Sequence, residues 1–131
     1  MIFYLISKLI KRTLKPNIIL TTDEEVKPRK NKGVVSLCES DDIHLVKDSK
    51  YIIELDRANS NDAVFYDLTN QEFINYIIDE FNFDLAYGTY TDISDIAPTL
   101  DIASVNLSTA YYNAHHTNEY INFKELKEIY V

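Results

Sequence analysis

The sequence predicts a single α/β domain over residues 1–131, in which helices flank a mixed, mostly parallel sheet in three layers. Short apolar runs typical of strands alternate along the chain with amphipathic segments of helical spacing. The runs at 18–20 and 51–53 are apolar without alternation, as expected when helices cover both faces of a sheet. A chain of 131 residues with 46% hydrophobic content is long enough to bury one sizeable core.

The first half of the chain is expected to hold two helices and two strands. Residues 2–14 place Phe3, Ile6 and Ile10 on one face of a helix, which Pro16 ends. The apolar run that follows predicts a strand over 17–22, and 33–45 is expected to contain a short helix. A second strand is expected over 51–55.

The second half continues the alternation. Residues 70–81 carry an apolar stripe of helical period, and Asn70 is a suitable N-cap. A short helix is expected to begin at Thr91 and Asp92 and to end before Pro98, because proline lacks an amide hydrogen. The remaining expected elements are strands over 63–66 and 102–107, a loop over 108–117 and a helix over 123–130.

Composition excludes several classes of protein. The net charge is −8, whereas a protein that binds nucleic acid is more often basic, so no nucleic acid partner is expected. Only two glycines are present, too few for a phosphate-cradling loop. One cysteine builds no disulfide framework, and the N-terminus is apolar before it is basic, the reverse of a secretory signal. No apolar run is long enough to span a membrane, so a cytoplasmic protein without a membrane partner is expected.

Groups able to bind a metal follow three of the expected strands. Asp23, Glu24 and Glu25 follow the first, Asp56 follows the second, and His115 stands with His116 in the loop after 102–107. Carboxyl ends of strands are where sites gather in α/β sheets. Carboxylate and imidazole together suit zinc, and a neighbouring glutamate can act as a base. Taken singly, the same groups also fit a solvated acidic loop tip, a surface pair of Asp56 with Arg57, and loop histidines.

Four segments resemble the C-terminal half of the two-metal, zinc-dependent exopeptidases of the aminopeptidase and carboxypeptidase-like clan. ILTTDEEV resembles the strand that leads to a Glu-Glu pair, and YIIELDR the strand that carries a metal-binding Asp. GTYTDISDIAP resembles a loop on the substrate side. ASVNLS followed by YYNAH resembles the strand and loop that deliver the last metal-binding histidine.

The resemblance implies roles for particular residues. Glu24 matches the general base, Glu25 and His115 match ligands of one metal, and Asp56 matches a ligand of the other. The implied cofactor is zinc. His116 occupies a place where the family usually has another residue, so the choice between the two histidines stays open. The residues expected near the pocket are Asp92 and Ser94.

This sequence departs from the family in two ways. The family's earlier metal histidine and bridging aspartate precede the helix that 2–14 resembles, and the stretch after Glu-Glu is basic here rather than glycine-rich. We therefore expect a truncated or split member with an incomplete zinc-exopeptidase-like fold. An uncovered sheet edge is prone to pairing, so the expected partner is a second copy of the chain or a complementing protein chain.

Two functions from different classes remain open at this point. The chain is either part of a zinc metallopeptidase or amidohydrolase, inactive alone and active when complemented, or a non-catalytic binding or structural protein on a degenerate peptidase fold. A third alternative is a regulator that binds a macromolecule through its acidic surface. The sequence leaves the substrate open.

Overall fold

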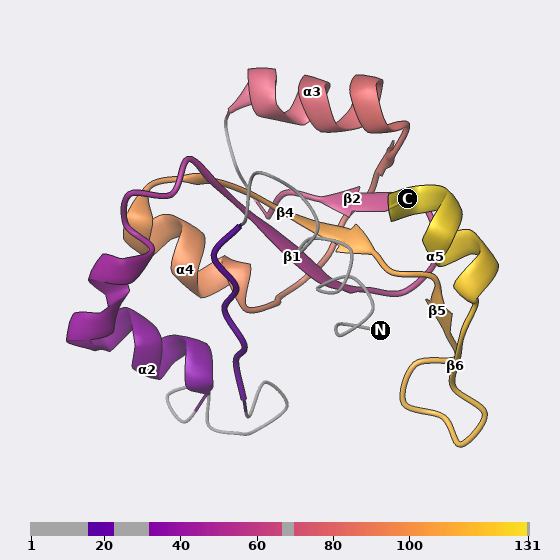
Figure 1. Ribbon diagram of the computed structural model, residues 1–131, viewed down its shortest axis with the longest axis horizontal. Helices are drawn as coiled ribbons and strands as arrows, with labels where there is room; N and C mark the ends of the chain where they lie inside the picture. Colours follow the sequence, from indigo (N-terminus) through magenta and orange to yellow (C-terminus); the bar gives the residue numbers. More distant parts are fainter. Residues whose placement is uncertain (1–15, 23–31, 67–69, 131) are drawn as a thin grey trace.

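The computed structural model describes residues 16–22, 32–66 and 70–130, and shows a mixed α/β fold around a four-stranded sheet (Figure 1). The described helices are α2 (Gly33–Glu39), the 3₁₀ helix η2 (Asp41–Leu45), α3 (Gln71–Phe81), α4 (Ile93–Leu100) and α5 (Phe123–Tyr130). The main sheet contains β1 (Tyr51–Arg57), β2 (Asp62–Val64), β3 (Asp84–Leu85) and β4 (Ala103–Ser108). A separate hairpin pairs β5 (Tyr111–Tyr112) with β6 (Tyr120–Ile121).

The main sheet is mixed and mostly parallel, as the sequence predicted. Its strand order is β1-β4-β2-β3. The pairs β1–β4 and β2–β3 are parallel, and only β2–β4 is antiparallel. Strand β4 therefore lies between two neighbours, and this central place explains why five of its six residues are buried.

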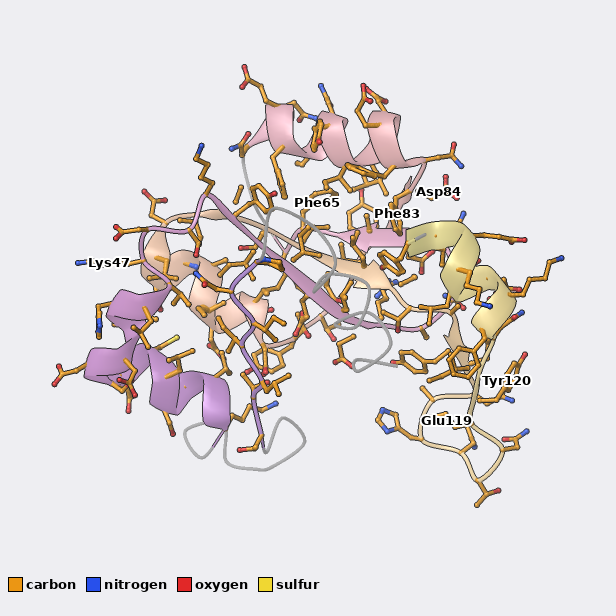
Figure 2. All side chains as sticks on the ribbon, viewed as in Figure 1. Lys47, Phe65, Phe83, Asp84, Glu119 and Tyr120 are labelled. Carbon is orange, nitrogen blue, oxygen red and sulfur yellow. The ribbon has the colours of Figure 1, made fainter. Side chains whose placement is uncertain are left out.

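Helices cover both faces of this sheet, which confirms the three layers. On one face, Val105 and Leu107 of β4 pack with Ile77 of α3. Figure 2 shows Phe65 and Phe83, which belong to the same core, near the sheet and α3. The core on the other face is formed mainly by α2 and α4, and its buried members are Val34, Val46, Ile93 and Ile96.

The described helices are short. The longest, α3, has 11 residues. Within residues 16–22, 32–66 and 70–130, no helix is both long and apolar enough to cross a membrane.

Several predicted elements are confirmed with small changes of boundary. Strand β1 covers the predicted 51–55 and continues to Arg57, and β4 matches the strand predicted over 102–107. The side chain of Asn70 accepts a hydrogen bond from the amide of Phe73, so it caps α3 as predicted. The helix predicted over 123–130 is α5, and a short helix is present within 33–45.

The prediction of a strand over 17–22 is wrong. The segment 16–22 has no regular secondary structure and all its residues are exposed, including Ile18 (48%) and Leu20 (64%). Its Thr22 carbonyl accepts from the amide of Gly33, at the start of α2, instead of joining a strand ladder. An apolar run predicts burial but does not supply a strand partner. The helix predicted over 2–14 lies outside the described residues.

Two further predictions need correction. Helix α4 does not end before Pro98 but runs through it to Leu100. The proline donates no backbone bond, yet Ile93, Ile96 and Ala97 bury the apolar face of the helix and hold it in place. The region 108–117 is not loop throughout, because β5 lies within it and pairs with β6.

Candidate functional site

Asp56 and His115 line the same pocket at the carboxyl ends of β1 and β4. This pocket, the strand-end pocket, has a volume of about 290 Å³. Its lining residues are Asp56, Arg57, Ala58, Asn59, Tyr66, Tyr90, Thr91, Asn106, Tyr111 and His115. Two of the metal ligands predicted from the sequence are therefore brought to one place by elements far apart in the chain.

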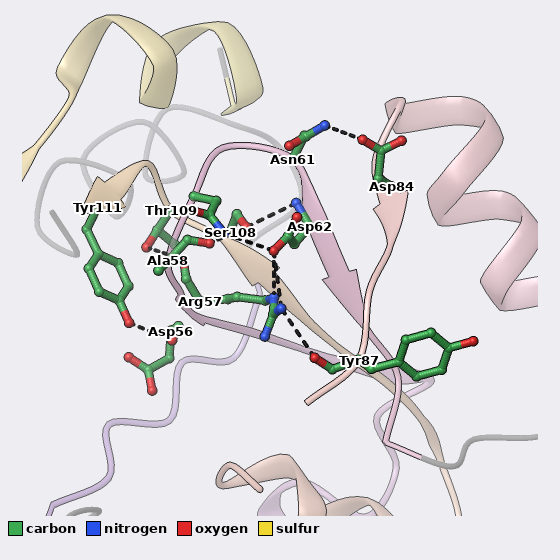
Figure 3. Close-up of polar contacts among 11 residues, drawn as sticks. Asp56, Arg57, Ala58, Asn61, Asp62, Asp84, Tyr87, Ser108, Thr109 and Tyr111 are labelled. Carbon is green, nitrogen blue, oxygen red and sulfur yellow. Dashed lines mark hydrogen bonds and ion pairs between the residues drawn. The ribbon is translucent and has the colours of Figure 1, made fainter. Parts of the chain in front are cut away.

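A bulge in β1 and two hydrogen bonds position Asp56. Glu54 pairs with Asn106 and Arg57 with Ser108, so β1 holds one extra residue between these pairs. Bulges of this kind redirect side chains and are common beside active sites. The Asp56 amide donates to Oδ1 of Asn106 at 3.1 Å. The Asp56 carbonyl accepts from the Tyr111 hydroxyl at 3.4 Å (Figure 3).

Arg57 forms its ion pair with Asp62 rather than with its sequence neighbour. Its Nη2 lies 3.2 Å from Oδ2 of Asp62 and also donates to the carbonyl of Tyr87 at 3.3 Å (Figure 3). The guanidinium is thus tied to the start of β2 and to the segment after β3. These contacts account for Arg57 without assigning it to the Asp56 carboxylate.

His115 lies in the loop between β5 and β6, in a left-handed backbone conformation with φ 63°. Its amide donates to Oε2 of Glu119 at 2.9 Å, and Figure 2 labels Glu119 in the same loop. Asn59 (φ 70°) and Tyr66 (φ 47°) also line the pocket with positive φ. Such conformations cost about 1–3 kcal/mol each and cluster at functional sites.

A buried polar chain connects this pocket to Glu54. Nδ2 of Asn106 donates to the Thr91 hydroxyl at 3.4 Å, and that hydroxyl donates to Oε2 of Glu54 at 2.8 Å. Asn106 and Thr91 are each 3% exposed. Because buried hydrogen bonds of this kind are costly to break, Thr91 and Asn106 hold Glu54 and the Asp56 backbone in a set arrangement.

Burial raises the pKa of the Glu54 carboxyl to about 7. The hydrogen bond from Thr91 lowers the pKa but does not cancel the effect of burial. The negative charges of Asp56 and Asp92 raise it further. Glu54 therefore changes charge near neutral pH.

The predicted site is only partly within the described residues. Glu24 and Glu25 lie outside them, and His116 is exposed and does not line the pocket. In the described part of the chain no group of three or more His, Cys, Asp or Glu side chains is arranged to hold a metal ion. A carboxylate and an imidazole suit zinc, but catalytic zinc has three protein ligands. Asp56 and His115 thus fit as two donors of a set that needs another.

Sequence reasoning missed Glu54, Thr91 and Asn106. A signal was present, because Glu54 lies two residues before Asp56 and so shares its side of a regular strand. A carboxylate within an apolar strand and an amide in the middle of ASVNLS both indicate a buried polar contact. Of the residues expected near the pocket, Asp92 lines a neighbouring cleft, and the Ser94 hydroxyl accepts from the Thr91 amide at 3.0 Å.

Comparison with protein-family models, curated proteins and solved structures finds no match for this chain. The zinc-exopeptidase resemblance therefore stays a prediction that rests on the motifs themselves.

Proposed function

We propose that the chain forms part of a zinc-dependent hydrolase centre of the exopeptidase type, with Asp56 and His115 as metal ligands. The observation that supports this proposal most directly is that both side chains line the strand-end pocket. They come from β1 and from the β5–β6 loop, and the resemblance implies a metal-binding role for each of them. Carboxyl ends of parallel strands are the usual place for such a site.

The roles of the chain's own residues follow from their chemistry. The resemblance assigns Asp56 and His115 to two different ions, but because both line one pocket we propose that they would hold a single ion, with Glu25 as the third ligand. Zinc in such a site supplies a Lewis acid that lowers the pKa of bound water. Glu24 would act as the general base. Asn106 and Tyr111 keep the backbone of Asp56 in place beside the pocket.

Completion of the centre by a partner is part of the proposal. In the described residues β1 is an edge strand, with β4 on one side only. Its Tyr51 and Ile53 are 54% and 44% exposed. An exposed apolar edge strand is a surface that another chain can cover. The partner proposed is a second copy of the chain or a complementing chain that adds ligands.

A non-catalytic binding or structural protein on the same fold is the second candidate. It is favoured by one observation, that the stretch after the Glu-Glu pair is basic here, whereas the family has a glycine-rich stretch at that place. On this alternative the pocket retains its shape and its strained backbone, but it does not assemble a working metal centre.

Zinc affinity tests the ligand assignment. We expect Asp56→Asn and His115→Gln each to weaken zinc binding by about tenfold or more, as measured by competition with a chromophoric chelator. The matched controls are Asp79→Asn, exposed on α3, and His116→Gln, and both should keep the wild-type affinity. Unchanged affinity in both ligand variants would sink the proposal.

Catalysis and partnership need separate measurements. Hydrolysis of aminoacyl and acetylated amino-acid amides by the zinc-loaded protein, abolished in Glu24→Gln, supports the hydrolase. Zinc binding without hydrolysis, alone or with a partner, supports the non-catalytic alternative. Sedimentation at micromolar concentration tests association, and a well-folded monomer there contradicts the proposed homo-oligomer.

A further inference from the structure

A second, larger cleft lies on the side of β1 that faces α2 and α4. This carboxylate cleft has a volume of about 500 Å³ and lies between the segment 16–22, β1 and α4. Its apolar lining includes Ile19, Val34, Val46, Ile52, Ile93 and Ile96. Two carboxylates, those of Glu54 and Asp92, also line it. Size, apolar walls and a few polar groups are the usual features of a site for a small molecule.

Asp92 is the unusual member of this lining. Asp92 is only 8% exposed to solvent. Oδ2 accepts a hydrogen bond from the Thr21 hydroxyl, whereas Oδ1 is buried and has no hydrogen-bond partner within the described residues. A buried carboxylate oxygen without a partner is costly, so its presence indicates a group that binds there.

Glu54 places a second carboxylate beside Asp92. The backbone of Asp92 lowers the pKa of the Glu54 carboxyl and the negative charge of Asp92 raises it, so the two groups lie close together. Across the described ranges neither side chain forms an ion pair. Lys50 also lines the cleft, but it is exposed and is not paired with either carboxylate. The cleft thus holds two adjacent acidic groups and an unused acceptor.

The walls indicate what kind of cation fits. The described part of the chain offers no group of three or more ligands for a metal ion. A strongly hydrated metal ion would also gain no binding free energy from contact with the isoleucines and valines that line the cleft. An ammonium group has three N–H donors for carboxylate oxygens, and a hydrocarbon chain attached to it can bury against the apolar walls.

We propose that the carboxylate cleft binds a primary ammonium group carried on an unbranched aliphatic chain, which donates to Oδ1 of Asp92 and to the Glu54 carboxylate. The aliphatic chain of the ligand packs against Ile93, Ile96 and Val46. Such a group belongs either to a free alkylamine or to a lysine side chain of a peptide. This site is separate from the strand-end pocket and does not rest on the hydrolase proposal.

An NMR titration of the ¹⁵N-labelled full chain tests the proposal. n-Hexylammonium is expected to shift the amides of Thr21, Glu54 and Asp92 in a saturable manner, and 1-hexanol to bind at least about fivefold more weakly because it carries no charge. Equal binding of the two would overturn the proposal. So would stronger competition by Mg²⁺ or Ca²⁺ at the same amides.

Single substitutions test whether the ammonium group binds to the Asp92 carboxylate. Asp92→Asn should weaken n-hexylammonium about tenfold, since a charge-assisted bond becomes a neutral one. The matched control Asp79→Asn, on the exposed side of α3, should bind as the wild type does. Wild-type affinity in a folded Asp92→Asn variant contradicts the assignment. If that variant does not fold, the comparison of amine with alcohol on the wild-type chain still decides.

A second ligand distinguishes a free alkylamine from a lysine side chain as the source of the ammonium group. N-acetyl-lysine methylamide carries the same terminal group on a peptide backbone. Comparable binding of this compound and n-hexylammonium indicates that the cleft admits a lysine side chain. Binding of n-hexylammonium alone indicates a free amine.

Discussion

Glu54 and Asp56 stand two residues apart on β1 and meet different surroundings. Asp56 is exposed at the polar strand-end pocket, whereas Glu54 is partly buried in the carboxylate cleft among apolar side chains. Thr91 and Asn106 lie between the two regions and hydrogen-bond towards both. The comparison shows that one strand can present one carboxylate to water and another to a desolvated cleft, and that burial decides the acidity of the second.

The largest expected effect is a pH-dependent difference in stability between the wild type and Glu54→Gln. The folded-state pKa of Glu54, about 7, lies above the ordinary value of 4.5, so its protonated form favours folding. That contribution is complete below pH 4.5 and is lost as the pH rises through 7. From pH 4 to pH 8 the variant should therefore gain roughly 3 kcal/mol relative to the wild type. Urea denaturation at a series of pH values measures this gain.

The matched control for this prediction is Glu80→Gln, an exposed glutamate on α3. Its stability difference from the wild type should stay small at every pH. If Glu54→Gln behaves in the same way as Glu80→Gln, the two carboxylates of β1 do not differ as the comparison requires.

Asn106→Ala should break the connection between the two regions. It removes the acceptor for the Asp56 amide and the donor to Thr91, both at a position that is 3% exposed. The expected loss is about 2 kcal/mol of unfolding free energy, because buried polar groups are left unpaired. Asn75→Ala, on the exposed face of α3, is the control. Equal losses of unfolding free energy in the two variants would show that Asn106 does not connect the two regions.

Gly33→Ala should disturb the carboxylate cleft and leave the strand-end pocket intact. A Cβ at Gly33 would lie 2.7 Å from the carbonyl oxygen of Thr22, which is backbone and cannot turn away. The segment 16–22 must shift, at a net cost of about 1–2 kcal/mol after the gain in helix propensity. Calorimetry measures the loss, and amide shifts should be confined to the Thr21 and Asp92 side.

Gly88→Ala should disturb the strand-end pocket and leave the carboxylate cleft intact. Its Cβ would lie 2.9 Å from the Tyr66 hydroxyl, at the strand-end pocket. Its amide shifts should therefore appear around Tyr66 and not around Asp92. Identical shift patterns for the two glycine variants would contradict the separation of the two regions.

The smallest expected effect belongs to Thr91→Val. It removes the hydroxyl that donates to Glu54, and the expected cost is about 1 kcal/mol. Because that bond lowers the pKa of Glu54, its loss should move the pKa further upward. A ¹³C titration of the Glu54 carboxyl follows this change, with Thr99→Val as the control. A downward movement would show that Thr91 does not stabilise the charged form.

The sequence by itself determined the elements whose residues carry a local pattern. Helix α3 follows from its apolar period and from the Asn70 cap, while β1 and β4 follow from their apolar runs. The mixed, mostly parallel sheet between two helical layers follows from the alternation of these elements along the chain. The motifs also marked Asp56 and His115 as candidate ligands of two different metal ions, and both residues line one pocket in the structure.

Only the tertiary structure decided what depends on contacts between distant residues. The segment 16–22 is apolar enough for a strand but lies at the surface, because a strand needs a partner. Helix α4 continues through Pro98 because the burial of Ile93 and Ile96 outweighs one missing hydrogen bond. The acidity of Glu54 and the unpaired oxygen of Asp92 arise from burial beneath other elements, which no local pattern of residues encodes.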